Sequence, residues 1–188
     1  MKKELLIFTF FLLSSMLLNA QKSNLEEFTS DSLENTNDTI SYFLEEKNSK
    51  ISLRDSLLNE LITYGKSFLG SPYKYGGRSK AGFDCSGYVS TVFSKIGVNL
   101  SYSSVGMSGS GRVVADSTIQ AGDILFFVNT QRGRNGIGHV GFVIEVENKE
   151  VLFLHSACNG GVKYEYLSHP YYKKHYYKAE RIPLFDID

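Results

Sequence analysis

One cysteine in this sequence stands where a nucleophile could be activated. Cys85 precedes a predicted helix over 86–96, whose free backbone N–H groups and positive dipole end favour a thiolate. Asp84 can cap this helix, and the same N–H groups can hold the oxyanion of a tetrahedral intermediate. Taken alone, Cys85 could equally be a small buried core residue.

Two histidines on predicted strands strengthen the catalytic interpretation. For His139 and His155 to share a face of a hairpin, paired positions need an even index sum. This requires an odd-length loop, such as 147–149 with its second or third residue left-handed. His155 then lies opposite Gly141, where a missing side chain leaves room for the two imidazoles. A cysteine, a histidine base and a second group that orients the base follow the logic of a catalytic triad.

The elements that must position these residues follow from periodicity. Helical spacing begins near Ser52 and stops at Gly70, and it returns over 86–96. An irregular connection follows, and β patterns then cover 123–128, 138–146, 151–156 and 161–167. Helices first and antiparallel strands afterwards predict an α+β fold with helices packed on one sheet.

The N-terminal third differs in composition from this compact part, which we assign to 51–188. Residues 1–20 resemble an export signal, with Lys2 and Lys3 before a short apolar run and Ala20 as a cleavage residue, although a retained anchor is an alternative. Residues 21–50 are predicted to be an acidic, poorly ordered tether, in which a short helix near 40–46 is possible. The three parts carry charges of +1, −4 and +3, so the net charge of zero is an average.

Composition excludes several classes of protein. A net charge of zero argues against a nucleic-acid binder, and two cysteines are too few for a disulfide scaffold or a four-cysteine zinc site. No cofactor is expected, because thiolate and imidazole supply the chemistry. The segment 164–178 is rich in tyrosine and lysine; we interpret it as a solvated edge strand rather than a platform for single-stranded nucleic acid.

The remaining cysteine and histidines are predicted to be structural. Cys158 could join Cys85 in a disulfide or in a zinc site, but ordered metal-ligand spacing is absent, so we predict a packed free thiol. His169 and His175 fall in a polar segment and are expected at the surface.

Four segments together resemble the NlpC/P60 family of bacterial cysteine peptidases. They are 82–87 (GFDCSG), 121–127 (AGDILFF), 138–143 (GHVGFV) and 154–157 (LHSA). The resemblance runs from about residue 58 to 182, and it implies a papain-like α+β fold and cleavage of peptidoglycan stem peptides. It implies that Cys85 is the nucleophile, His139 the general base and His155 the orienting residue. It also implies that Tyr73, Asp84 and Ser86 line the substrate site and that no metal takes part.

Within that family the chain is most similar to the small murein DD-endopeptidases. It departs from them over 101–103 and 106–111, a loop expected to border the cleft. The similarity to these enzymes favours cleavage of a D-alanyl–diaminopimelate bond, with the γ-D-glutamyl–diaminopimelate bond as the alternative. A catalytically silent peptidoglycan-binding module is the alternative from another class. The expected location is the periplasm or cell envelope, with stem peptides as partners, no stable membrane span and no nucleic acid; the oligomeric state is not predicted.

Overall fold

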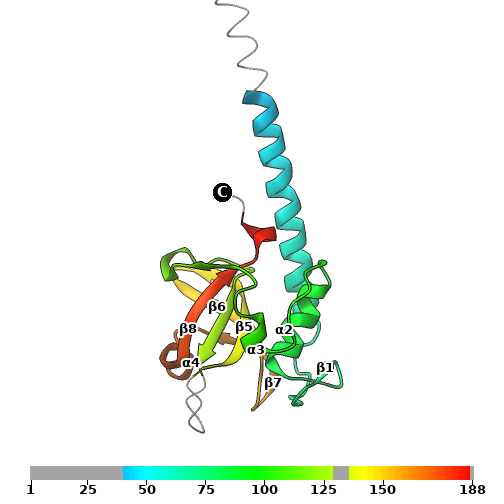
Figure 1. Cartoon of the computed structure of the whole chain (residues 1–188), viewed down its shortest axis with the longest axis vertical. Helices are drawn as coiled ribbons and strands as arrows, with labels where there is room; N and C mark the ends of the chain where they lie inside the picture. The colour runs from blue at the N-terminus through cyan, green and yellow to red at the C-terminus, as the bar shows by residue number, and fades with distance from the viewer. Residues whose placement is uncertain (1–39, 129–135, 187–188) are drawn as a thin grey trace, which may run out of the picture. The chain divides into compact units, whose positions relative to one another are not determined.

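A computed structural model describes residues 40–128 and 136–186 of the chain (Figure 1). The chain divides into two units, Met1–Lys50 and Ile51–Asp188. The predicted export signal and the first part of the predicted tether lie outside the described residues. Among those residues, no helix is both long enough and apolar enough to cross a membrane.

Residues 40–50 are helical, so the short helix considered near 40–46 is present and longer than expected, and this part of the predicted tether is not poorly ordered. The helical conformation continues through residue 66. No glycine or proline interrupts 40–64, and Lys50 Nζ lies 2.7 Å from Glu46 Oε1, one helical turn away. The polar composition that suggested disorder is thus compatible with an exposed helix supported by charge pairs.

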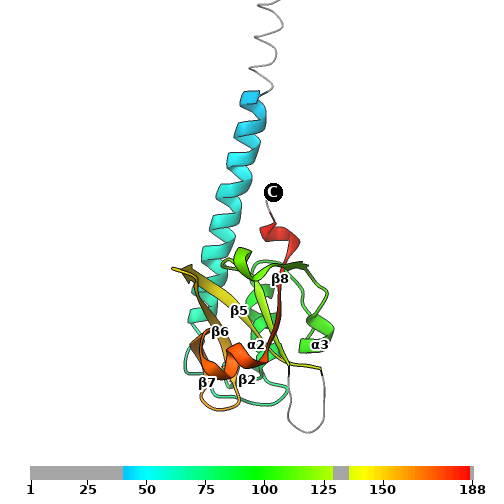
Figure 2. The same ribbon diagram turned by 90° about the vertical axis from the view of Figure 1, so that its left-hand side faces the viewer.

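The main sheet of the described residues has six antiparallel strands, which confirms the predicted α+β class. The strand order is β3-β8-β4-β5-β6-β7, and Figure 2 labels β5 to β8 of this sheet. The strands are β3 (Arg112–Val114), β4 (Ile124–Val128), β5 (Ile137–Glu147), β6 (Glu150–Ala157), β7 (Gly161–Tyr166) and β8 (Tyr176–Arg181). A separate short hairpin pairs β1 (Arg78–Ser79) with β2 (Gly82–Phe83).

Two of these strands were missed by sequence periodicity. β3 has only three residues, and β8 ends in the charged pair Glu180 and Arg181, which is buried. The predicted edge strand over 164–178 is wrong: that segment contains the end of β7, a helix and the start of β8. β8 lies between β3 and β4 and is therefore an interior strand. Its composition did not indicate this position.

Helices and short helical turns connect the strands. They are α2 (Cys85–Ser94), α3 (Ser104–Met107), η1 (Asp116–Thr118), α4 (Pro170–His175) and η3 (Pro183–Phe185). α2 packs against β5 and β6, and Figures 1 and 2 show it on one side of the sheet. α3, β3 and η1 occupy the region that the sequence predicted to be an irregular connection.

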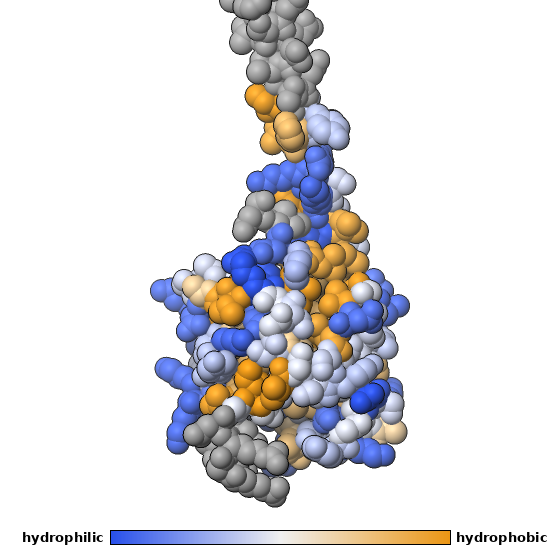
Figure 3. All heavy atoms as spheres, viewed as in Figure 1, coloured by the Kyte–Doolittle hydropathy of each residue, from blue (hydrophilic) through white to orange (hydrophobic). Residues whose placement is uncertain are grey.

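The two faces of the sheet bury separate apolar clusters. On β5, Phe142 belongs to the first cluster, with α2, whereas its neighbour Val143 belongs to the second, because successive side chains of a strand point to opposite faces. The second cluster also contains Phe127, Phe153 and, from α4, Tyr172. On the face shown in Figure 3, polar residues lie between small apolar patches, as is usual for a surface in water.

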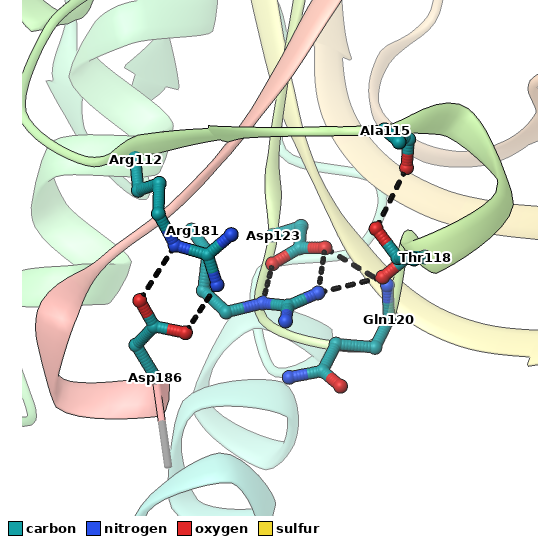
Figure 4. Close-up of polar contacts among 7 residues, drawn as sticks. All are labelled: Arg112, Ala115, Thr118, Gln120, Asp123, Arg181 and Asp186. Atoms are coloured by element: carbon teal, nitrogen blue, oxygen red, sulfur yellow. Dashed lines mark hydrogen bonds and ion pairs between the residues drawn. The ribbon is translucent and has the colours of Figure 1, made fainter. Parts of the chain in front are cut away.

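A buried ion pair joins the residue before β4 to the end of β8. Arg181 Nε and Nη2 donate to the two carboxylate oxygens of Asp123, at 2.9 and 3.0 Å (Figure 4). Arg181 Nη2 also donates to Thr118 O at 2.7 Å, and the backbone N–H of Gln120 donates to Asp123 at 2.8 Å. The pair therefore fastens the η1 region to the sheet, and the Asp of the AGDILFF segment is explained by packing rather than by catalysis.

Candidate active site

Cys85 is the first residue of α2, as predicted. Asp84 is the N-cap, and its Oδ1 accepts from the backbone N–H of Gly87 at 2.6 Å and from the Ser86 hydroxyl at 3.0 Å. Its Oδ2 accepts from the backbone N–H of Gly76 at 2.9 Å. These hydrogen bonds hold the helix start and the glycine turn together, so Asp84 and Ser86 are already engaged within the fold.

Glycines allow the turn to lie directly on the helix start. A side chain at Gly87 would collide with the carbonyl oxygen of Gly77, and that oxygen accepts the backbone N–H of Asp84 at 3.1 Å. The same turn brings Tyr73 beside Phe83, to which it is joined by a parallel bridge. The backbone around Cys85 is thus packed too closely for larger residues.

Tyr73 lies in the electrostatic environment of both cysteines. Its pKa is raised above the usual range, first by burial, then by hydrogen bonding to Cys158 and by the charges of Cys158, Cys85 and Asp84. The structure therefore brings Tyr73, Cys85 and Cys158 together, as the resemblance implied for the first two.

The Cys85 thiol is buried, with 9% of its residue surface exposed. Burial, followed by the charge of Asp84, raises the pKa of Cys85 to about 11, although the backbone N–H groups of Val140 and Ser86 act in the opposite direction. Loss of hydration on burial therefore acts against the thiolate that the helix start was expected to favour. The hydrogen bond from Val140 also places the thiol against β5, the strand that carries His139.

The hairpin of β5 and β6 brings the histidines together by a different route from the predicted one. Its loop, 148–149, has two residues rather than three, and both have positive φ, at 49° and 68°. A register shift in β5 between Val143 and Glu145 restores the even pairing. A side chain at Gly141 would lie 3.1 Å from Cβ of His155. The predicted neighbours are correct, whereas the predicted odd loop is wrong and a bulge takes its place.

The two imidazoles are joined directly. His139 Nε2 lies 2.8 Å from His155 Nδ1, with the rings nearly perpendicular at 88°. Burial lowers the pKa of His139 to about 4. Burial, and then the charges of His139 and Lys163, lower the pKa of His155 well below its usual range. Both rings are therefore neutral at neutral pH, and His139 Nδ1 is the nitrogen not engaged by His155.

Tyr172 ends this chain of side chains. Its hydroxyl lies 3.4 Å from His155 Nε2, and its ring packs edge-on against His155 at a centroid distance of 5.0 Å. The sequence gives no signal for this residue, since one tyrosine among many follows no periodic pattern. Its place on α4, over the second cluster, is visible only in the fold.

A cavity of about 510 Å³ borders His139. Its lining includes Cys158, Lys163, Glu165, His169, Tyr172 and His175. Cys158 is exposed, because it follows the last residue of β6, so the predicted packed thiol is wrong. His175 is buried rather than at the surface: its ring stacks on Tyr171 at 4.4 Å and its Nδ1 bonds the carbonyl of that residue at 2.7 Å. His169 is exposed, as predicted.

A cysteine at the start of a helix that packs on two strands, with a hydrogen-bonded pair of histidines across those strands, is the arrangement of papain-like cysteine peptidases. Residues 70–181 match the NlpC/P60 family, and the chain belongs to this family.

Relatives and a solved structure agree with this assignment. A probable endopeptidase of Haemophilus influenzae is 41% identical over 114 residues, which is 60% of this chain and 67% of that protein. The murein DD-endopeptidase MepS/murein LD-carboxypeptidase of Escherichia coli K12 is 34% identical over 114 residues, 60% of this chain and 56% of that protein. The crystal structure of an NlpC/P60 family protein from Bacillus cereus has 33% identity and a TM-score of 0.59, covering 66% of this chain and 39% of that one. The papain-like α+β fold is thereby confirmed.

Proposed function

We propose that this protein is an exported cysteine endopeptidase that cleaves peptidoglycan peptides, with the D-alanyl–diaminopimelate bond as the favoured site. The observation that carries the proposal is the bonded pair His139 and His155, on the two strands against which α2 packs with the buried Cys85 thiol at its start. The choice of bond is supported by the Escherichia coli relative, whose name specifies a murein DD-endopeptidase. The matched region spans 56% of that relative, so substrate and partners are carried over here as part of the proposal.

The neutral state of the site suggests general-base catalysis rather than a preformed ion pair. As Cys85 Sγ attacks the amide carbonyl, His139 Nδ1 accepts the thiol proton, and backbone N–H groups at the start of α2 stabilise the oxyanion. His139 then gives that proton to the leaving amine as the C–N bond breaks, which leaves a thioester. A water molecule attacks the thioester with His139 as base, and the proton returns to the sulfur as the acid product departs.

The cavity beside His139 suits the leaving half of the substrate, because the residue that protonates the leaving amine must face it. Lys163 and Glu165 supply opposite charges in its lining, with Nζ and Oε2 3.1 Å apart. In a D-alanyl–diaminopimelate cross-link, both amines of the leaving diaminopimelate are in amide bonds, so its free carboxylate is the charged group, and Lys163 supplies the matching charge. We therefore assign this cavity to the diaminopimelate side of the scissile bond, and Tyr73 to the wall near the thiol.

Digestion of purified muropeptides tests the function. Wild-type protein and Cys85→Ala are incubated with cross-linked and uncross-linked muropeptides, and products are identified by mass spectrometry. Loss of hydrolysis in Cys85→Ala with an unchanged circular dichroism spectrum supports the proposal, and product masses identify the bond. Ser94→Ala, at the exposed end of the same helix, is the matched control. Retained hydrolysis in Cys85→Ala refutes the nucleophile; binding without hydrolysis by the wild type indicates a silent wall-binding module.

Export is tested separately. The proposed signal over 1–20 predicts a mature chain that begins at Gln21. Cell fractionation followed by the intact mass of the recovered protein measures this directly. Recovery in the cytoplasmic fraction at full length contradicts export, whereas a full-length chain in the membrane fraction indicates a retained anchor.

A further inference from the structure

Tyr172 is the last residue of the hydrogen-bonded chain that begins at His139 and continues through His155. It is 7% exposed, and His155, to which its hydroxyl points, is 0% exposed. Its ring is fixed by Phe127 and Phe153 in the second cluster, at centroid distances of 5.4 and 5.3 Å. The hydroxyl is therefore held against His155 Nε2 by packing and is not simply close to it.

The protons of the chain leave only one arrangement that supports catalysis. A neutral imidazole carries one N–H, so the single proton between His139 Nε2 and His155 Nδ1 belongs to one ring or the other. If His155 donates, His139 carries its own proton on Nδ1 and cannot accept one from Cys85. If His139 donates, its Nδ1 is free to act as the base, and His155 carries its proton on Nε2.

Protonation of His139 during the reaction requires the same arrangement, in which His139 donates to His155. Once His139 has taken the thiol proton, both of its nitrogens are donors, so His155 Nδ1 must accept and His155 Nε2 must be protonated. That N–H is buried, and the Tyr172 hydroxyl is the group positioned to accept it, at 3.4 Å. Without an acceptor, a buried N–H is left unpaired at the moment the reaction depends on it.

We propose that Tyr172 is a positioning residue that accepts a hydrogen bond from His155 Nε2 and so keeps His139 Nδ1 available as the proton acceptor. The effect on turnover rests on the proposed function, whereas the effect on the tautomers does not. The active group is accordingly a chain of four side chains, Cys85, His139, His155 and Tyr172, of which the last two act through His139.

Kinetics of Tyr172→Phe test the proposal, because phenylalanine preserves the packing and removes the acceptor. We expect kcat on muropeptides to fall roughly 10–100-fold, the effect of one unpaired buried donor, with little change in KM. Tyr176→Phe is the matched control: it also borders the second cluster and loses one hydroxyl hydrogen bond, to Asp116 at 2.9 Å. Its kcat should stay near the wild-type value. Equal kcat in Tyr172→Phe and wild type would overturn the proposal.

Tautomer measurement separates this proposal from the proposed function. Long-range ¹H–¹⁵N spectra of the full chain labelled in histidine should show Nε2–H for both His139 and His155 at neutral pH, and Tyr172→Phe should shift His139 towards Nδ1–H. A wild-type His155 protonated on Nδ1 would overturn the proposal even if the variant failed to fold. A wild type with the expected tautomers and no hydrolysis of any muropeptide would instead refute the function and leave the hydrogen bond in place.

Discussion

Two groups of buried polar residues in this protein have hydrogen bonds of similar length. They differ in whether a hydrogen-bonding atom remains available for another partner. In the Asp123–Arg181 pair, both carboxylate oxygens and two guanidinium nitrogens are engaged, and neither residue borders the cavity. In the chain from His139 to Tyr172, all groups are neutral, and one nitrogen of His139 is not engaged by the chain. A buried ion pair whose atoms all have partners holds strands together. A chain of neutral, titratable side chains that borders a cavity can instead transfer a proton.

Removing the base is the largest test of this comparison. We expect His139→Ala to lower kcat on muropeptides by several orders of magnitude, on the scale of roughly 10⁶ seen when a catalytic base is lost. Its thermal unfolding temperature should also fall, because the variant leaves Nδ1 of the fully buried His155 without its partner, so turnover is compared per folded molecule. A variant with substantial remaining turnover, measured by product mass spectrometry, would show that another group accepts the thiol proton.

The opposite result is expected for the ion pair. Arg181→Met leaves Asp123 buried without its cation, so the free energy of unfolding should fall by about 3–5 kcal/mol, with kcat per folded molecule retained. Urea denaturation measures the first quantity, and an assay well below the melting temperature measures the second. Arg112→Met is the control, because Arg112 pairs with Asp186 at the exposed surface and its loss should barely alter stability. A loss of kcat in folded Arg181→Met would mean that the pair also shapes the site.

The sequence predicted candidate members of the site but not their chemical state. Cys85, His139 and His155 were chosen as candidates because residue type, predicted element and family resemblance all agreed. Their spatial relation depended on register, and the bulge between Val143 and Glu145 has no signal in the alternation of β5, so the correct pairing was predicted from an incorrect loop. The thiol's protonation depends on burial, which is a property of the whole fold.

The fold was predicted less completely where polar residues are buried. α2 and β4 to β7 follow apolar periodicity and were found with small boundary shifts. β8 was missed because Glu180 and Arg181 resemble surface residues until their partners are seen: the Glu180 carboxylate accepts the backbone N–H of Gly109, and Arg181 pairs with Asp123. Tyr172 was missed for a related reason. Its partner His155 is on a different element, and only the position of α4 in the fold brings the two side chains together.

Acid should lower the free energy of unfolding through protonation of His139. The pKa of His139 is lowered from 6.5 to about 4 by burial, so the unfolded chain binds the proton more readily. The stabilisation is fully present above pH 6.5 and is lost as the pH falls towards about 4, by about 1–3 kcal/mol for this partly buried ring. Urea denaturation across this range measures the slope, and His139→Asn should make it shallower. An unchanged slope would show that His139 is not held neutral by burial.

The smallest expected effect concerns the cavity. If it holds the diaminopimelate side of the substrate, Lys163→Gln should raise KM by about 2–5-fold, the size of one partly screened charge contact, and leave kcat nearly unchanged. Lys149→Gln, in the β5–β6 turn and outside this cavity, should leave KM unaltered. Amidation of the free diaminopimelate carboxylate in the substrate removes the charge that Lys163 would meet, so the difference between wild type and Lys163→Gln should disappear with that substrate. A difference that persists would mean that Lys163 acts on the histidine chain, through its charge near His155, and not on the substrate.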